Sequence, residues 1–458
     1  MTSAVLPPGV LLSWYGDDFT GSAAVMEVLS FGGLEAVLFL DTPTPSQLAA
    51  FPKARAIGIA GIARSQSPDW MDTHLPPIFS ALGRLRTPLT HYKVCSTLDS
   101  SPAIGSIGHA VELAAPVLGG AWYPTLIAAP PIGRYQAFGQ LFAAADGAVY
   151  RLDRHPVMSR HPVTPMSESD VALHLAQQTQ LPTACLDLVA LRGADGGIAA
   201  LARLRAGGRP IITLDTLDDA DLAAAGRLLW EQRGEHLLAI GSQGIEYALL
   251  AYWRAIGALP PPPPPSSAGA RRQLAAVSGS VSATTAAQIA WSAQHGFGLV
   301  AFDAASVASD AAMDAAIDHA VVAAKAILAG GESVLVHSAR GPNDPAIAAF
   351  REAVSSSSLE LSAANARLGE ALGRILDRLL HETDLDRAVI SGGDTSGHAG
   401  LQLGVHALTA LAPTISGAAL CTAHTSRGRP LQLALKGGQM GTPDYFGWIR
   451  AGGGPRQT

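Results

Sequence analysis

Two adjacent carboxylates stand shortly after the first apolar run of the chain. The run Val10–Trp14 is typical of a short buried strand, and Asp17 and Asp18 follow it, just before a helical segment that opens near Ser22. A carboxylate here can cap the helix N-terminus. It can also accept hydrogen bonds from substrate hydroxyls or act as a general base. Asp17 and Asp18 are therefore candidate catalytic residues, and Asp17 is also a candidate substrate contact. The alternative is that one caps the helix and the other is solvated.

A second polar turn follows the apolar run Leu89–Val94. It offers an ammonium, a thiol and two hydroxyls, in the segment Lys93, Val94, Cys95, Ser96 and Thr97. Hydroxyls and backbone amides suit the oxygens of a small polyol acid, and Lys93 suits its charge. We treat this segment as a candidate substrate-binding turn. The alternative is a Ser/Thr-rich capping turn.

Two arginines also lie just past predicted strands. Arg64 follows Ala56–Ala60, and Arg134 follows Thr125–Ala129. The guanidinium group presents a rigid fork that matches a carboxylate in two hydrogen bonds. Because the chain has only 31 Lys and Arg residues in total, we expect both arginines to bind the substrate, although each taken alone is more typical of a surface residue.

The second half of the chain has three glycine-containing turns after predicted strands. The candidate residues in these turns are Ser280, Ser282, Gly392, Gly393, Asp394, Thr395, Gly437 and Gly438. Glycine lets the backbone approach a phosphate closely, and free amides at a helix start favour its negative charge. Three such turns favour a nucleotide triphosphate, although neither a Walker A loop nor a GxGxxG fingerprint is present. Asp394 is a candidate for a magnesium or water contact, or else a helix cap.

Short apolar runs alternate with helical segments in both halves. The predicted strands are 10–14, 36–40, 56–60, 89–94, 125–129, 211–214, 237–240, 274–277, 298–301, 334–337, 388–390 and 431–435. The predicted helices are 22–30, 104–114, 170–178, 219–230, 284–293, 310–328, 366–380 and 396–408. Continuous apolar strands alternating with helices predict an α/β fold with buried, mostly parallel sheets. In such sheets ligands bind beyond the carboxyl ends of the strands.

Six consecutive prolines, Pro260–Pro265, mark a boundary. Proline has no amide hydrogen and a fixed φ, so this run cannot join a helix or a sheet interior, and we expect a stiff polyproline II spacer. The predicted organisation is an N-terminal domain over 1–259, a linker over 260–269 and a C-terminal domain over 270–458.

Charge and composition exclude several classes of protein. The net charge is −6 without a basic block, which argues against a nucleic-acid partner. No uninterrupted apolar run approaches the ~20 residues of a membrane span, and the first apolar run lacks the preceding basic residues of a secretory signal. The three cysteines, Cys95, Cys185 and Cys421, are far apart, which indicates a reducing compartment and argues against a structural zinc site. We expect a cytoplasmic protein that could form a homo-oligomer, and beyond Asp394 we name no candidate metal ligand.

The chain resembles the four-carbon acid sugar kinase family (D-threonate, D-erythronate and 3-oxo-tetronate kinases) from about residue 12 to 446. The matching motifs occur in order at 17–21, at 93 with 96–98, at 279–282, at 392–395 and at 436–438. The resemblance implies an acid-sugar-binding domain, an ATP-binding domain and an active site in the cleft between them, with ATP and Mg²⁺ as cofactors. It implies that Asp17, Arg64 and 93–96 contact the substrate. It further implies that Ser280, 392–395 and Gly438 contact ATP.

One departure from the family pattern bears on the substrate. The family usually has Arg-Gly after the Ser-Thr-Leu motif, whereas here Asp99 and Ser100 follow Leu98. If that arginine normally holds the substrate carboxylate, another cation must do so here, and Arg64 or Arg134 could supply it. A branched acid such as 3-oxo-isoapionate, which some kinases of the family use, is a candidate substrate.

The resulting prediction is ATP-dependent phosphorylation of a hydroxyl on a small sugar acid, in carbohydrate catabolism. A nucleotide-dependent oxidoreductase would fit the α/β pattern and the glycine turns, but it lacks the fingerprint. A non-catalytic acid-sugar sensor would bind the acid without consuming ATP.

Overall fold

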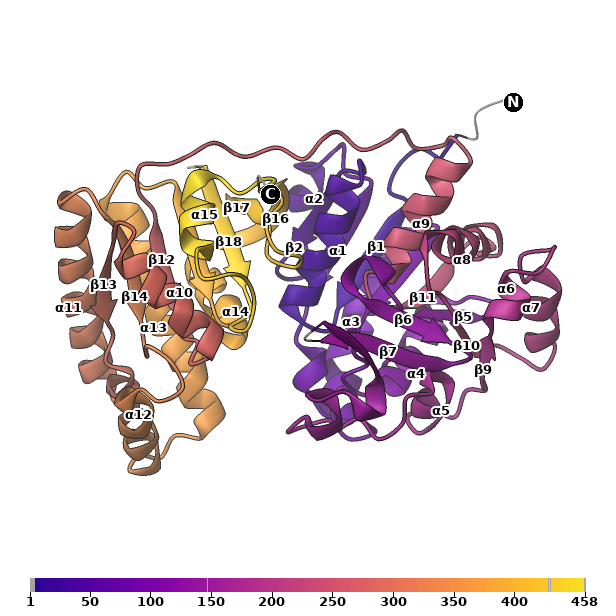
Figure 1. Cartoon of the computed structure of the whole chain (residues 1–458), viewed down its shortest axis with the longest axis horizontal. Coiled ribbons are helices and arrows are strands. Elements are labelled where there is room, and N and C mark those ends of the chain that lie inside the picture. The colour runs from indigo at the N-terminus through magenta and orange to yellow at the C-terminus, as the bar shows by residue number, and fades with distance from the viewer. Residues whose placement is uncertain (1–4, 146, 427, 429, 457–458) are drawn as a thin grey trace. The chain divides into compact units, whose positions relative to one another are not determined.

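The computed structural model describes residues 5–145, 147–426, 428 and 430–456 (Figure 1). The chain divides into two compact units, Met1–Pro263 and Pro264–Thr458. Each is built around a sheet of mostly parallel strands with helices between them. The predicted α/β class is therefore confirmed. Residues 260–271 form neither helix nor strand.

The sheet of the first unit has eight parallel strands in the order β2-β3-β1-β4-β11-β5-β10-β9. Their bounds are β1 Leu12–Gly16, β2 Ala36–Phe39, β3 Ala56–Ala60, β4 Leu89–Lys93, β5 Tyr123–Leu126, β9 Thr183–Leu186, β10 Ile211–Leu214 and β11 Leu237–Gly241. The α-helices are α1 Phe19–Phe31, α2 Pro45–Ala49, α3 Pro68–Arg84, α4 Ile107–Leu118, α5 Val171–Ala176, α6 Leu188–Leu191, α7 Ile198–Leu204, α8 Asp219–Glu231 and α9 Gly244–Ala255. Most of these strands are buried along their whole length, because helices cover parallel sheets on both faces.

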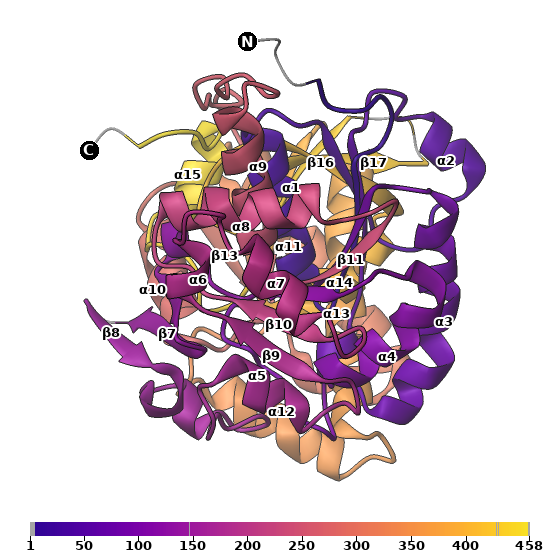
Figure 2. The ribbon, with the colours of Figure 1, turned by 90° about the vertical axis from the view of Figure 1, so that its right-hand side faces the viewer.

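The first unit also contains a small antiparallel sheet that the sequence did not predict. Its strands are β6 Arg134–Ala137, β7 Gln140–Ala145 and β8 Ala148–Arg151. Figures 1 and 2 show β7 set apart from the strands of the main sheet. The sheet bears on function because Arg134 is the first residue of β6.

The sheet of the second unit has the order β13-β14-β12-β15-β18-β17-β16, in which the first five strands are parallel and the last two antiparallel. The strands are β12 Ala275–Ser278, β13 Phe297–Ala301, β14 Ser333–His337, β15 Arg387–Ser391, β16 Val405–Ala412, β17 Leu420–Thr425 and β18 Leu431–Lys436. The helices are α10 Ala283–Ala293, α11 Asp310–Ala329, α12 Pro345–Ser355, α13 Leu361–Glu382, α14 Gly393–Gln402 and α15 Tyr445–Ala451.

The helix predicted over 396–408 is wrong beyond Gln402. The α14 helix ends there, and β16 begins at Val405. Gly404 has a φ of 63°, a left-handed conformation that terminates helices and favours glycine. The apolar residues after it pair with β17 instead of continuing the helix.

Candidate functional site

The two carboxylates after β1 have different roles in the structure. Asp18 is the N-cap of α1, and its Oδ1 accepts a hydrogen bond from the Gly21 amide at 3.0 Å. Asp17 is only 2% exposed, and its amide donates to the Lys93 carbonyl at 2.9 Å. The capping alternative therefore applies to Asp18, which leaves Asp17 as the buried carboxylate of the pair.

Arg64 joins the two carboxylates into one charge cluster. Its Nε and Nη2 donate to Asp17 Oδ2 and Oδ1 at 3.2 and 2.6 Å, and Nη2 also donates to Asp18 Oδ1 at 2.5 Å. The sheet order explains the convergence, because β3, β1 and β4 are neighbours and their carboxyl ends meet at one edge. The turns that carry Asp17, Arg64 and Lys93 are thus brought together.

Burial dominates the electrostatics of this cluster. It raises the pKa of Asp17, and the cations of Arg64 and Lys93 oppose that rise. Burial alone would lower the pKa of Arg64, but the charges of Asp17, Cys95 and Asp18 keep it well above its usual value. A carboxylate with a raised pKa beside a fixed cation has the character of a general base.

Gly21 is a site residue that the sequence did not single out. A Cβ built on Gly21 would lie 2.4 Å from Asp18 Oδ1, 2.9 Å from Lys93 Nζ and 3.5 Å from Arg64 Nη2. Three charged side chains therefore surround its bare face, and any larger residue would displace them. Its only signal in the sequence was its place at the end of the 17–21 motif.

The turn after β4 lies beside the same cluster. Lys93 is buried and donates from Nζ to the Val94 carbonyl at 2.6 Å. Val94 is fully buried, its amide donates to the Gly241 carbonyl at 2.7 Å and its carbonyl accepts from Lys93, so its backbone polar groups are already engaged within the protein. Cys95 Sγ lies 3.0 Å from Thr97 Oγ1, and Ser96 is half-buried in the same turn.

Arg134 belongs to this neighbourhood but lacks a carboxylate partner among the described residues. The Cys95 thiol acts electrostatically on both Arg64 and Arg134. Arg134 Nη1 donates only to carbonyls, those of Ile132 and Gly133 at 3.2 Å and that of Ala144 at 3.4 Å, and its buried Nε has no partner. Burial lowers its pKa, as expected for a cation that no anion compensates.

The two residues that depart from the family pattern are engaged in local packing. Asp99 accepts a hydrogen bond from Thr164 Oγ1 and lies 3.5 Å from His161 Nδ1. Ser100 is buried, and its Oγ lies 2.9 Å from His174 Nε2. These contacts attach the turn after β4 to the segment 161–174.

The three glycine turns of the second unit follow β12, β15 and β18, which are adjacent in the sheet. Ser282 Oγ donates to the Gly438 carbonyl at 2.6 Å, and a Cβ on Gly438 would lie 2.3 Å from Ser280 Oγ. Gly392 donates its amide to the Lys436 carbonyl at 2.9 Å. The structure therefore brings the predicted turns to one edge of the sheet.

Two helices begin at this edge. Ser282 caps α10 and accepts a hydrogen bond from the Thr285 amide at 3.0 Å. Gly392, with a φ of 128°, precedes α14 and provides no side-chain cap. Gly393, Asp394 and Thr395 form the first turn of α14, but their side chains lie outside the described part of the structure.

The described residues offer neither a metal-binding cluster nor a membrane-spanning helix. The described part of the chain contains no group of three or more His, Cys, Asp and Glu that could hold a metal ion. The described side chains therefore supply no dedicated magnesium site. This does not conflict with a nucleotide site, where magnesium is usually held by one or two carboxylates together with phosphate oxygens. Among the described helices, none is long and apolar enough to cross a membrane.

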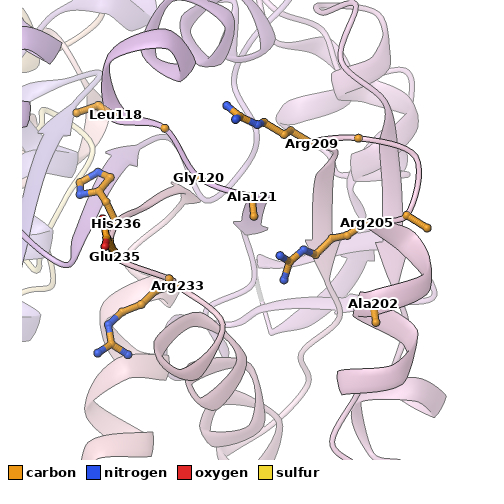
Figure 3. Close-up of a pocket in the computed structure, with 13 residues that line it drawn as sticks. Leu118, Gly120, Ala121, Ala202, Arg205, Arg209, Arg233, Glu235 and His236 are labelled. Carbon is orange, nitrogen blue, oxygen red and sulfur yellow. The ribbon is translucent and has the colours of Figure 1, made fainter.

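A depression of about 970 Å³ lies at the other edge of the first unit's sheet (Figure 3). Its lining comes from the segments 118–121, 202–209 and 233–236, which precede β5, β10 and β11. It therefore lies at the amino ends of these strands, whereas Asp17, Arg64 and Lys93 lie at the carboxyl ends. The depression is not part of the charged cluster.

Comparisons with known proteins agree with the division of the chain into two units. Residues 12–249 match the family model of a sugar-binding N-terminal domain, and residues 275–446 match that of a nucleotide-binding C-terminal domain. A 3-oxo-isoapionate kinase of Paraburkholderia graminis is 47% identical over 97% of this chain and 95% of its own. A 3-oxo-tetronate kinase of Cupriavidus necator is 29% identical over 97% of this chain and 98% of its own. The crystal structure of Haemophilus influenzae protein HI1011 shares the fold, with a TM-score of 0.73, 21% identity and coverage of 96% of this chain and 99% of that one.

Proposed function

The chain belongs to the four-carbon acid sugar kinase family, and from this premise we propose that it transfers the γ-phosphate of ATP to a hydroxyl of a branched sugar acid resembling 3-oxo-isoapionate. Its curated relatives are sugar-acid kinases, and nothing favours an oxidoreductase or a non-catalytic sensor. The branched substrate is proposed because the relative with 47% identity acts on 3-oxo-isoapionate, whereas the 3-oxo-tetronate kinases are 27–30% identical.

The observation that carries the proposal is that the charged cluster lies in the first unit and the glycine turns lie in the second. The first unit gathers Asp17, Arg64 and Lys93 at strand ends within the domain that matches a sugar-binding model. The second unit gathers three glycine turns within the domain that matches a nucleotide-binding model. Phosphoryl transfer requires both ligands and little covalent chemistry from the protein, since positioning and charge compensation supply most of the catalysis.

The pairing of charges in the site favours Arg134 as the residue that binds the substrate carboxylate. Arg64 already compensates two carboxylates, Asp17 and Asp18. Arg134 has no carboxylate partner among the described residues, and its buried Nε is left without an acceptor. A carboxylate would satisfy the free part of the guanidinium fork. Lys93, Ser96 and Thr97 would then serve the hydroxyl and keto oxygens.

Asp17 is the proposed general base. Its buried carboxylate has a raised pKa, and a base works best when its pKa approaches the working pH. Asp18 is committed to capping α1 and holding Arg64, so we assign it a positioning role. We propose that Ser280, Ser282, Gly392, Gly393, Thr395, Gly437 and Gly438 hold the ATP phosphates. Asp394, at the start of α14, is the proposed protein contact for Mg²⁺, which would neutralise charge on the phosphate oxygens.

A coupled ADP-release screen tests the function directly. The purified chain with ATP and Mg²⁺ would be assayed against linear and branched sugar acids of four and five carbons. We expect turnover with a branched 3-oxo acid to exceed turnover with D-threonate, D-erythronate and 3-oxo-tetronate. Preference for a linear acid would contradict the proposed substrate, and no ADP release with any acid would contradict the kinase assignment. The cytoplasmic location and the homo-oligomeric state stay predictions.

A further inference from the structure

A row of polar side chains crosses the carboxyl edge of the second unit's sheet. Ser278 at the end of β12 is in register with His337 of β14 on one side and with Ser391 of β15 on the other. Ser391 is in turn in register with Lys436 of β18. Because partners in register on neighbouring parallel strands project to the same face of a sheet, these four polar side chains share one face, directly below the glycine turns.

Lys436 is the only one of the four that carries a full positive charge. It is 1% exposed, and its Nζ donates to the Gly437 carbonyl at 3.1 Å and to Thr285 Oγ1 at 3.5 Å. Its ammonium also lies 5.8 Å from the centre of the Tyr445 ring. Among the described side chains no carboxylate pairs with it. Three donors on one ammonium thus have one close acceptor and one distant acceptor.

An uncompensated buried ammonium is costly, because burial removes its hydration. Burial lowers the pKa of Lys436 to about 8. The neighbouring Ser391 hydroxyl is also buried and has no hydrogen-bond partner in the described structure. Unsatisfied buried groups of this kind are rare in folded proteins and call for an explanation. A bound anion would satisfy both residues.

The surroundings of Lys436 are built to receive such an anion. The carbonyl of Gly438 is held by hydrogen bonds from Ser282 Oγ at 2.6 Å and Thr285 Oγ1 at 2.8 Å, so the turn above the lysine is fixed. Beside it, α14 begins at Gly393, and the preceding Gly392 provides no side-chain cap. Uncapped first-turn amides favour a negative charge. An ammonium and a helix start therefore lie at neighbouring strand ends, and no described carboxylate compensates the ammonium.

We propose that Lys436 is a phosphate-binding residue that supplies the positive charge of the nucleotide site, and that the Ser391 hydroxyl beside it donates to the same phosphate chain. This inference rests on the proposed function, because it requires that the second unit binds a nucleotide. It adds a cation to a site whose other proposed phosphate contacts are backbone amides and hydroxyls. The ligand would complete the ammonium, with which no carboxylate among the described side chains pairs.

Calorimetry on the full-length chain tests the proposal with ATP, ADP and adenosine as separate probes. Lys436→Met should weaken ATP binding about ten- to a hundredfold, the range for the loss of one charged hydrogen bond. The loss should be smaller for ADP and near zero for adenosine. Lys436→Arg should restore part of the ATP affinity. Lys325→Met is the matched control, because Lys325 forms an exposed pair with Glu382 at 2.7 Å on the same unit, and it should change none of the affinities.

The outcomes separate this inference from the kinase assignment. Unchanged ATP affinity in Lys436→Met, or an equal loss for ATP and adenosine, would show that the lysine has a structural role and would overturn the inference. If Lys436→Met does not fold, Ser391→Ala and Lys436→Arg provide the same comparison between ATP and adenosine, and a loss confined to ATP supports the inference. A wild-type chain that binds ATP but phosphorylates no sugar acid would instead contradict the proposed function alone.

Discussion

Replacing Arg64 with methionine should destabilise the chain strongly at neutral pH. The substitution removes two hydrogen bonds to Asp17, at 3.2 and 2.6 Å, and one to Asp18 at 2.5 Å. Asp17 is 2% exposed, so its carboxylate cannot be rehydrated without opening the structure. Breaking a buried pair by removing one partner typically costs about 3–5 kcal/mol. Because Lys93 still acts on Asp17, we expect a loss near the lower end, about 3 kcal/mol.

The dependence of this loss on pH follows from the sign of the Asp17 shift. Burial raises the pKa of Asp17 in the folded state, and Arg64 opposes that rise. Without Arg64 the pKa must rise further, so the folded variant takes up a proton at a pH where the unfolded chain is still ionised. A raised folded pKa contributes stability that is present at low pH and lost as the pH rises through that pKa. The deficit of Arg64→Met should therefore shrink as the pH falls.

Urea unfolding followed by tryptophan fluorescence at pH 8 and pH 5 measures both effects. Arg227→Met is the matched control, because Arg227 pairs with Glu231 at 2.9 Å on the exposed face of α8. Exposed helical pairs of this kind contribute about 0.3–0.5 kcal/mol, so the control should lose little at either pH. A loss below about 1 kcal/mol in Arg64→Met, or a loss that is the same at both pH values, would refute the argument that Asp17 depends on Arg64 for its charge.

Three further predictions address catalysis, nucleotide binding and acid stability. Asp17→Asn should lower turnover at least about a hundredfold in the ADP-release assay, the contribution expected of a general base, and near-normal turnover would exclude Asp17 from that role. Gly438→Val should weaken ATP binding at least about tenfold in calorimetry while leaving sugar-acid binding unchanged. The reason is that its Cβ would lie 2.3 Å from Ser280 Oγ, whereas glycine permits the close approach of a phosphate. An ATP affinity equal to that of the wild type would place the phosphates elsewhere. Burial lowers the pKa of both His174 and His337 to about 4, so stability should fall as the pH drops from about 6.5 to about 4, by up to about 1.4 kcal/mol per pH unit for each histidine. Urea midpoints that stay constant over this range would contradict the neutral, buried state of the two imidazoles.

Most strands of the main sheets were predictable because they are continuously apolar, although β9 and β17 were not predicted. Segments such as Ala56–Ala60 and Leu237–Gly241 are almost fully buried in the structure, and burial on both faces of a parallel sheet selects such sequences. The β6–β8 strands were missed because they are only partly buried, as in Arg134–Ala137. Their extended conformation depends on pairing with one another, which local sequence does not reveal. β16 was missed because apolar residues continue across Gly404 with a spacing that also suits a helix.

The proposed location of the acid site followed from the rule that ligands bind beyond the carboxyl ends of strands. The sequence predicted which turns were polar, but it did not give the order of the strands. Only the neighbouring positions of β3, β1 and β4 show that Arg64 meets Asp17 and Lys93. Lys436 belongs to the 436–438 motif, but no role was predicted for it, because its proposed importance depends on burial and on the lack of a carboxylate partner among the described residues. A lysine at the end of an apolar strand gives no such signal in the sequence.

The contacts of Asp99 and Ser100 explain what these residues do in place of the Arg-Gly of the family pattern. Asp99 accepts a hydrogen bond from Thr164, and Ser100 bonds to His174, so both side chains are occupied in fixing the turn. Cys95 in this turn influences the pKa of Arg134, so an arginine at position 99 would add a second cation near Arg134. With aspartate at position 99, Arg134 is a cation that no described carboxylate pairs with, and its buried Nε has no acceptor. If the arginine of the family pattern holds the substrate carboxylate, the proposed carboxylate contact lies in this chain on Arg134, the first residue of β6, and no longer on the turn after β4. In a branched acid the carboxylate is displaced relative to the hydroxyls, which fits a carboxylate contact at Arg134. Arg134→Met should therefore raise the KM for the branched acid while leaving the ATP affinity unchanged.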